Sequence, residues 1–176
     1  VFADPGIYTF MGYLLLFHEL DLDYTLSTYA SEGGNFGSFT SFNMAKKLNA
    51  KMYAEAERLN VKWLLGGECG HMWRVINQYM DTYNGPAPAN MEIPVSPITG
   101  TVFSNATSTK MVHIAEFTAD LIHHNKLNLR PERNTGIITT FHDSCNPARA
   151  MGMLEEPRAV LRAVCPEFVE MPPHTC

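Results

Sequence analysis

The sequence predicts a mixed α/β fold in which crossover helices connect the strands of a parallel sheet. Short runs of strand-forming residues alternate with helix-length amphipathic segments along the chain, which is long enough for one domain over residues 1–176. Loops rich in glycine or cysteine follow three of the expected strands, after Tyr29, Leu65 and Phe141. Because ligands bind beyond the carboxyl ends of parallel strands, we expect these loops to form a site at one sheet edge.

The first half of the chain is expected to contain three helices and two strands. Asp4 and Pro5 begin a helix whose apolar positions recur at helical spacing as far as His18. Residues 24–29 are rich in strand formers, and Thr40 or Ser41 caps a second helix with Glu55 on its polar side. The apolar stripe of that helix comprises Met44, Leu48, Met52 and Leu59. Residues 61–65 are typical of a short buried strand, and a third helix is expected over 72–83.

The second half begins with a proline-rich connection over residues 84–101, which is too apolar for a mobile linker. A helix is expected to start at Ser108 and to bury five apolar positions. These are Val112, Ala115, Phe117, Leu121 and Ile122. Residues 136–141 are typical of a strand, Pro157 opens a helix that runs to about Val164, and residues 168–169 start another strand.

Composition narrows the possible functions. Charged residues make up 18% of the chain, below the roughly 25% of typical soluble domains, which indicates surface covered by a partner. The net charge of -5 and the absence of any Lys/Arg run argue against a nucleic-acid binder. The apolar stretch 11–17 is far shorter than the ~20 residues of a membrane span, and no signal peptide precedes it. We expect no direct membrane span, so that any membrane is reached through another protein.

The termini suggest a segment of a longer subunit, because the chain lacks an initial Met and stops at Cys176 without a closing helix. Its other cysteines, Cys69, Cys145 and Cys165, are too few and too widely spaced for a disulfide scaffold. In a reducing compartment, such cysteines serve metal binding, redox chemistry or core packing. Cys165 lies on an apolar helix face and is expected to be a core thiol.

The first candidate site is the motif GGECGH at residues 66–71. Gly66, Gly67 and Gly70 allow a sharp turn and a close approach of backbone to a ligand. Cys69 stands just before a helix N-terminus, whose partial positive charge favours a thiolate. Such a thiolate can ligate iron or zinc or attack a disulfide. A structural turn with an inert thiol is the alternative.

The second candidate site is the motif HDSCNP at residues 142–147. Asp143 or Asn146 fixes a turn after the expected strand, which presents Cys145 at the sheet edge with His142 nearby. Arg149 follows and can stabilise a thiolate or a negatively charged cluster. The alternative is a helix cap in which Cys145 is a small apolar side chain. His18 and His113 are expected to be interior histidines, and no dinucleotide loop, phosphate-binding loop or Cys-x-x-Cys pair is present.

Four stretches of the chain resemble a known redox family, namely residues 28–37, 65–74, 94–101 and 140–149. They are similar to the cysteine-rich catalytic subunits of the heterodisulfide reductase D type, which include subunits of membrane-bound Dsr redox complexes. Cys145 matches the first cysteine of the family's Cys…Cys-Cys-Gly…Cys-x-x-Cys signature. Cys69 falls where the other half of the family has a Cys-x-x-Cys, with Gly66 at the partner position. The Cys-Cys-Gly is missing and is expected beyond Thr175, where Cys176 is a candidate member of that segment.

The resemblance implies an oxidoreductase subunit of dissimilatory sulfur metabolism, linked to sulfite reduction, with a [4Fe-4S] cluster of unusual, non-cubane type. Most cluster ligands would lie outside this chain, with Cys145 and Cys69 the metal ligands within it. The implied partners are a membrane quinone-oxidising subunit, other subunits of the complex, and a small sulfur-carrier protein with redox cysteines. The implied location is the inner face of the cytoplasmic membrane, on the cytoplasmic side.

The same resemblance suggests roles for side chains near the two cysteines. Gly33, Gly34 and the three glycines of the first motif would let backbone N–H groups approach the cluster. The candidates to supply a proton or offset the cluster's charge are His71, His142, Arg74 and Arg149. Two other hypotheses stay open: a zinc site built from Cys69, Cys145, His71 and His142, and an interaction domain without a cluster.

Overall fold

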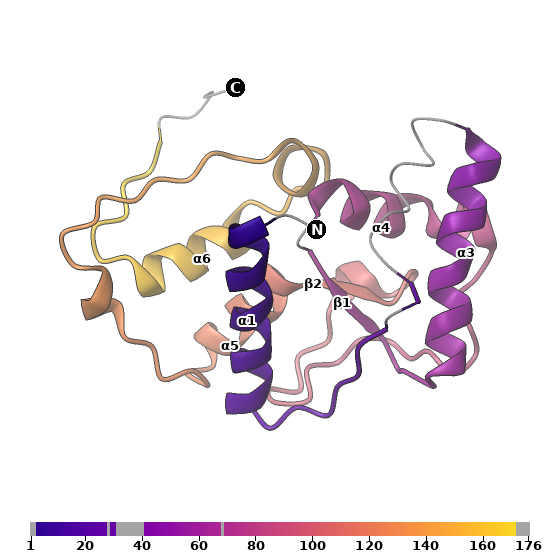
Figure 1. The fold of residues 1–176 in the computed structure, drawn as a ribbon. Coiled ribbons are helices and arrows are strands. Elements are labelled where there is room, and N and C mark those ends of the chain that lie inside the picture. Colours follow the sequence, from indigo (N-terminus) through magenta and orange to yellow (C-terminus); the bar gives the residue numbers. More distant parts are fainter. Residues whose placement is uncertain (1–2, 28, 31–40, 68, 172–176) are drawn as a thin grey trace.

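The computed structural model describes residues 3–27, 29–30, 41–67 and 69–171, and these form a mixed α/β fold. Two parallel strands, β1 (Leu64–Gly66) and β2 (Met111–His113), form the sheet. Their register pairs Leu64 with Met111, Leu65 with Val112 and Gly66 with His113. Figure 1 shows α3 (Phe42–Arg58) and α4 (Gly70–Asn84) on one side of these strands and α5 (Ile114–His123) on the other. The predicted fold class is confirmed.

Both faces of the small sheet are buried, because successive strand residues point to opposite sides. Leu64 and Met111 join one apolar cluster with the buried face of α4, which comprises Met72, Trp73, Ile76 and Met80. Leu65 and Val112 join a second cluster with Phe103, Ala106, Phe117 and Leu121. A short sheet covered by helices on both faces is the arrangement expected for parallel strands.

The first helix, α1 (Ala3–Glu19), forms as predicted from its helical spacing. Phe17 near its end is buried, and its ring lies 4.8 Å from that of Tyr24. Most other apolar side chains of α1, including Tyr8 and Leu15, are exposed in this chain. No helix among the described residues is long and apolar enough to span a bilayer.

The second helix of the structure, α3, begins at its predicted cap, where the Ser41 hydroxyl accepts a hydrogen bond from the Met44 N–H at 3.1 Å. The predicted apolar stripe is wrong. Met44 is 46% exposed, and the buried side instead carries Ala45, Asn49, Tyr53 and Ala56. The small alanines let α3 approach its neighbours closely. Glu55, expected on the exposed side, is also buried.

The burial of Glu55 is possible because its carboxylate is fully paired. It accepts two hydrogen bonds from Arg58, each 2.8 Å long, and one from the Ser27 hydroxyl at 2.9 Å. These hydrogen bonds, led by those from Arg58, hold the pKa of Glu55 at about 2, against the opposing effect of burial. The contact also ties the segment before residue 28 to α3.

The proline-rich connection is ordered, as expected. Its turn is closed by the Ser96 N–H, which donates to the Thr101 carbonyl at 2.8 Å. The buried Asp120 of α5 accepts a hydrogen bond of 2.6 Å from the Thr99 hydroxyl. Burial raises the pKa of Asp120, but the hydrogen bonds from the connection outweigh it and the net shift is downward. The connection is therefore fastened to the helix that follows β2.

Three predicted elements are wrong in detail. The described part of 24–29 forms no strand, and 136–141 contributes only one bridge, between Thr139 and Phe168. Ile138 is 77% exposed, so this segment lacks the neighbours that a strand needs. Ser108 does not begin a helix, because Lys110 has a positive φ of 59° and β2 follows it. The helix there, α5, begins after His113 instead.

The last part of the chain carries three short helical elements. The 3-10 turn η2 (Pro131–Asn134) precedes the single bridge, and η1 (Ser104–Ala106) lies before β2. A π-helical turn, η3 (Cys145–Ala150), follows the bridge, and α6 (Glu155–Val164) forms at its predicted position. Figure 1 shows α6 beside α5, beyond the two strands.

Candidate functional site

The first cysteine-bearing turn begins where β1 ends. Gly67 has a φ of 126°, which L side chains rarely adopt, so the chain can turn here only with glycine. Cys69 follows as the N-cap of α4 in extended conformation, and its side chain makes no capping hydrogen bond. It is half-buried and packs against the first apolar cluster. The predicted position just before a helix N-terminus is confirmed.

The second cysteine-bearing turn is η3. Cys145 is its first residue and is exposed, while Pro147 and Ala148 are buried beneath it. The turn is π-helical, with the Arg149 N–H donating to the Ser144 carbonyl at 3.1 Å. Such turns are rare and occur frequently at functional sites. Cys145 is thus a solvent-accessible thiol on a turn whose other side is anchored in the core.

The two turns contact each other directly. A Cβ on Gly70 would lie 2.8 and 2.9 Å from ring carbons of Pro147, so glycine is required for the start of α4 to meet η3. Four residues further along α4, the Arg74 guanidinium donates to the Asn146 Oδ1 at 3.1 Å. The turns of Cys69 and Cys145 are therefore neighbours. They meet through a helix start and a π-helical turn, not through adjacent strands of one sheet.

The turn of Cys145 is also clamped from behind by α6. Arg158 donates to Asp143 Oδ1 at 2.7 Å and to Glu170 Oε1 at 2.9 Å. Hydrogen bonding to Arg158 lowers the pKa of Asp143, and Arg149 and His142 add smaller effects in the same direction. Arg158, only 12% exposed, therefore links the approach to Cys145 with the segment that leads toward the C-terminus.

The other predicted site residues are dispersed around these turns. His71 is exposed in the first turn of α4, and His142 and Arg149 are exposed beside Cys145. Gly66 pairs with His113 in the sheet. Gly33, Gly34 and Cys176 lie outside the described residues. Within the described ranges, no group of three or more His, Cys, Asp or Glu side chains could hold a metal ion. The four-residue zinc site is therefore not assembled by this arrangement.

One residue beside the first turn was expected only to be interior. His113 is 6% exposed, and its ring occupies the space where a Gly67 side chain would be. It caps α5, with Nδ1 accepting from the Ala115 N–H at 3.1 Å and its own N–H donating to Glu116. Burial lowers its pKa to about 4. The His-x-x-Glu spacing of a capping box could have revealed this role in sequence.

The arrangement fits part of an iron–sulfur site. Such clusters are held by cysteine thiolates, four of them in the usual [4Fe-4S] type. The neighbouring turns supply two, and Gly67 and Gly70 leave no side chain between backbone and its surroundings. The Nε2 atom of His113 is buried without a hydrogen-bond partner among the described residues, as a donor awaiting an acceptor would be. The described residues can thus provide half of the thiolate ligands.

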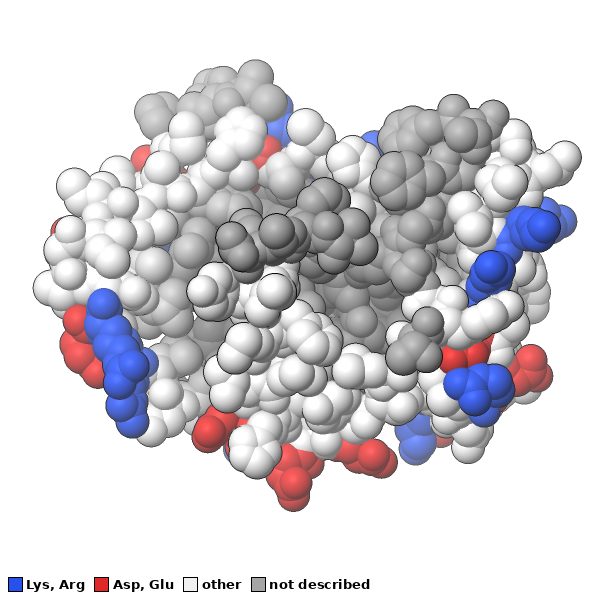
Figure 2. All heavy atoms as spheres, viewed as in Figure 1, with Lys and Arg blue, Asp and Glu red and all other residues white. Residues whose placement is uncertain are grey.

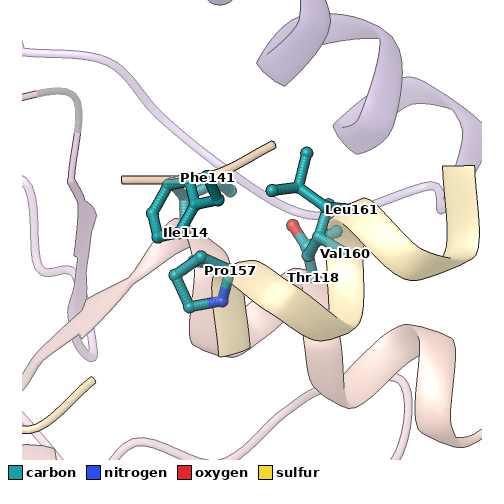
Figure 3. A pocket seen from close by; sticks show the side chains of 7 residues that line it. Ile114, Thr118, Phe141, Pro157, Val160 and Leu161 are labelled. Carbon is teal, nitrogen blue, oxygen red and sulfur yellow. The ribbon is translucent and has the colours of Figure 1, made fainter. Parts of the chain in front are cut away.

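The pocket of about 350 Å³ between α5 and α6 has a different character (Figure 3). Ile114 and Thr118 of α5 face Pro157, Val160 and Leu161 of α6 across it, and Phe141 and Ala115 complete the lining. Its lining includes no acid, base or thiol, so it is not part of the cysteine site. Figure 2 shows that charged side chains on one face lie at the periphery, around a largely uncharged centre.

The chain has curated relatives among archaeal redox proteins. It is 48% identical over 191 aligned positions to the Hdr-like menaquinol oxidoreductase iron–sulfur subunit of Archaeoglobus profundus. It is 47% identical over 190 positions to the Hdr-like menaquinol oxidoreductase iron–sulfur subunit 2 of Archaeoglobus fulgidus. The chain is homologous to the Hdr-like iron–sulfur subunits. Both alignments cover 99% of the chain but 34% of the relative, so the chain spans about a third of the length of these proteins.

A more distant similarity extends to the heterodisulfide reductases themselves. Over 63 residues, 35% of this chain is 40% identical to 15% of the D-type subunit of the dihydromethanophenazine:CoB–CoM heterodisulfide reductase from Methanosarcina mazei. No protein-family profile matches the chain, and no solved structure matches it significantly. The expected kinship with heterodisulfide-reductase-like iron–sulfur subunits is confirmed, and it makes the chain part of an oxidoreductase-associated iron–sulfur subunit.

Proposed function

We propose that this chain belongs to a redox subunit that passes electrons from a membrane quinone-linked partner to a sulfur–sulfur bond. The substrate is a disulfide or trisulfide on a small sulfur-carrier protein of dissimilatory sulfur metabolism. The supporting observation is the contact of two cysteine-bearing turns, at Gly70 and Pro147. The names of the relatives, which mention menaquinol oxidoreduction, support the quinone-linked partner.

The reaction requires electrons, protons and a site that admits a second sulfur compound. Opening one disulfide consumes two electrons and two protons and releases two thiols. A bound iron–sulfur cluster supplies electrons one at a time. Cys69 and Cys145 would hold part of that cluster, and the exposure of Cys145 leaves its side of the site open to a carrier protein. The remaining ligands are expected from parts of the subunit outside this chain, in a non-cubane [4Fe-4S] arrangement.

The surrounding side chains would manage charge and position. His142 and Arg149 lie close enough to Asp143 to lower its pKa, so they place positive potential beside Cys145. They are the candidates to offset the negative charge of the cluster or to deliver protons, together with His71 at the start of α4. Arg158 would hold the Cys145 turn in place from the opposite side.

Partners and location follow from the same proposal. The subunit would work at the inner face of the cytoplasmic membrane, bound to its quinone-oxidising partner and other subunits. The exposed apolar side chains of α1, among them Ile7, Tyr8 and Leu15, offer surface for such contacts. The largely uncharged centre of the face in Figure 2 is also suited to them.

The test compares three cysteine variants of the full-length subunit, purified without oxygen. Cys145→Ala and Cys69→Ala should lose cluster iron, acid-labile sulfide and the paramagnetic signal, together with reduction of the carrier's disulfide. Cys165→Ala is the matched control, because this half-buried thiol at the end of α6 is expected to be structural. It should keep the cluster and lose about 1 kcal/mol of stability. A folded Cys145→Ala protein with its cluster and activity intact would remove Cys145 from the ligand set.

A further inference from the structure

The buried His113 imidazole has a donor with no role in the fold. Its Nδ1 atom accepts from the Ala115 N–H, so the proton of the neutral ring resides on Nε2. Nε2 is buried and has no hydrogen-bond partner among the described residues. Buried donors are nearly always satisfied, and an unsatisfied one frequently indicates a missing ligand or a functional role.

The donor points toward the turn that carries Cys69. A Cβ on Gly67 would lie 2.6 Å from Nε2, so the nitrogen faces the open side of that residue. The ring is held in place by Trp73, which packs edge-on at 5.0 Å, and by its capping bond to α5. The orientation of Nε2 is therefore fixed from two sides.

The imidazole is also uncharged under ordinary conditions. Burial lowers the pKa of His113 to about 4, and the nearby Gly67 backbone offsets only part of this lowering. A neutral N–H group can donate to a sulfur anion without neutralising its charge. Hydrogen bonds to the sulfurs of a cluster stabilise the more negative, reduced state and so raise its reduction potential.

We propose that His113 is a positioning residue whose Nε2–H donates to a sulfur atom of the cluster site anchored at Cys69. This inference rests on the proposed function, because the acceptor exists only if the subunit binds the cluster. The chain would thus tune the potential of the cluster from beneath the Gly67 turn. The competing explanation is that His113 only caps α5 and fills the space beside Gly67.

The test uses the full-length, cluster-loaded subunit and two variants. In His113→Asn, the amide oxygen can replace Nδ1 as the cap of α5, but the Nε2–H donor is lost. In His113→Phe, both the cap and the donor are lost. Both variants should shift the one-electron reduction equilibrium about tenfold toward the oxidised form, which is about 59 mV more negative. His113→Phe should also unfold at lower temperature, whereas His113→Asn should not.

A measurement on the wild-type protein makes the test independent of variant folding. Pulsed EPR of protein labelled with ¹⁵N-histidine should show a nitrogen coupled to the cluster spin. The coupling should persist in His71→Asn and His142→Asn, which alter exposed histidines. Absence of the coupling, or an unchanged potential in a folded His113→Asn protein, would overturn the proposal while leaving the cluster in place. Absence of iron and sulfide from the wild-type subunit would overturn both this inference and the proposed function.

Discussion

Replacing Gly67 with alanine should unfold the protein more easily than any comparable glycine substitution. Two costs combine at this position. The φ of 126° strains an L residue by about 1–3 kcal/mol. The new Cβ would also lie 2.6 to 2.7 Å from three atoms of the His113 ring, and such overpacking costs about 1–3 kcal/mol.

The His113 ring cannot yield cheaply, because it is packed against Trp73 and caps α5. We therefore expect Gly67→Ala to lower the free energy of unfolding by roughly 2–6 kcal/mol, a large share of the roughly 5–15 kcal/mol of a typical domain. Gly152→Ala is the matched control, since Gly152 also has a positive φ, of 75°, but no atom lies within 4 Å of its added Cβ. It should cost about 1–2 kcal/mol.

Urea unfolding, followed by tryptophan fluorescence, measures both variants, with Trp73 as a reporter beside the clash. The double variant Gly67→Ala/His113→Ala should be less destabilised than the sum of its parts, because the second change removes the clash. Equal losses for Gly67→Ala and Gly152→Ala, within about 0.5 kcal/mol, would contradict the close contact between Gly67 and His113.

Three further predictions concern the surroundings of the two cysteines. Because burial lowers the pKa of His113 from 6.5 to about 4, the unfolded chain binds its proton more readily than the folded protein. Stability should therefore fall as the pH drops from about 6.5 toward 4, by up to ~3 kcal/mol from this group, and His113→Asn should flatten that part of the pH–stability curve. Gly70→Ala should force η3 away from α4; we expect less bound iron per subunit and faster hydrogen exchange over residues 145–150, and unchanged values would argue against the contact. Arg158→Gln should cost about 1–3 kcal/mol in thermal unfolding, since its nearly buried guanidinium bridges two carboxylates. Arg162→Gln is its control: with 53% of the side chain exposed and longer ion pairs, it should cost under about 1 kcal/mol.

The helices were largely predictable because their signals are local. The Ser41 cap, the start of α4 after the glycine turn and the start of α6 near Pro157 each depend on residues within one helical turn. The position of Cys69 before a helix could be predicted for the same reason. The buried face of α3 could not, because the choice between Met44 and Ala45 depends on how closely its neighbours approach.

The strands were less predictable because pairing depends on distant partners. Residues 136–141 have strand-forming side chains, yet Ile138 stays exposed and Thr139 makes a single bridge. Met111 to His113 were expected in a helix, but Val112 pairs with Leu65, 47 positions earlier in the chain, and becomes a strand. Propensity is weaker than such packing when a neighbouring strand is available.

By itself, the sequence determined the fold class, the helix starts, the two cysteine-bearing turns and the kinship with heterodisulfide-reductase-like subunits. Only the tertiary structure decided that these turns meet through Gly70 and Pro147, and that the His113 ring fills the space beside Gly67. The physical reason is that caps and turns satisfy hydrogen bonds within a few residues, whereas close packing joins side chains far apart in sequence. Spacing along the chain carries the first kind of information and not the second.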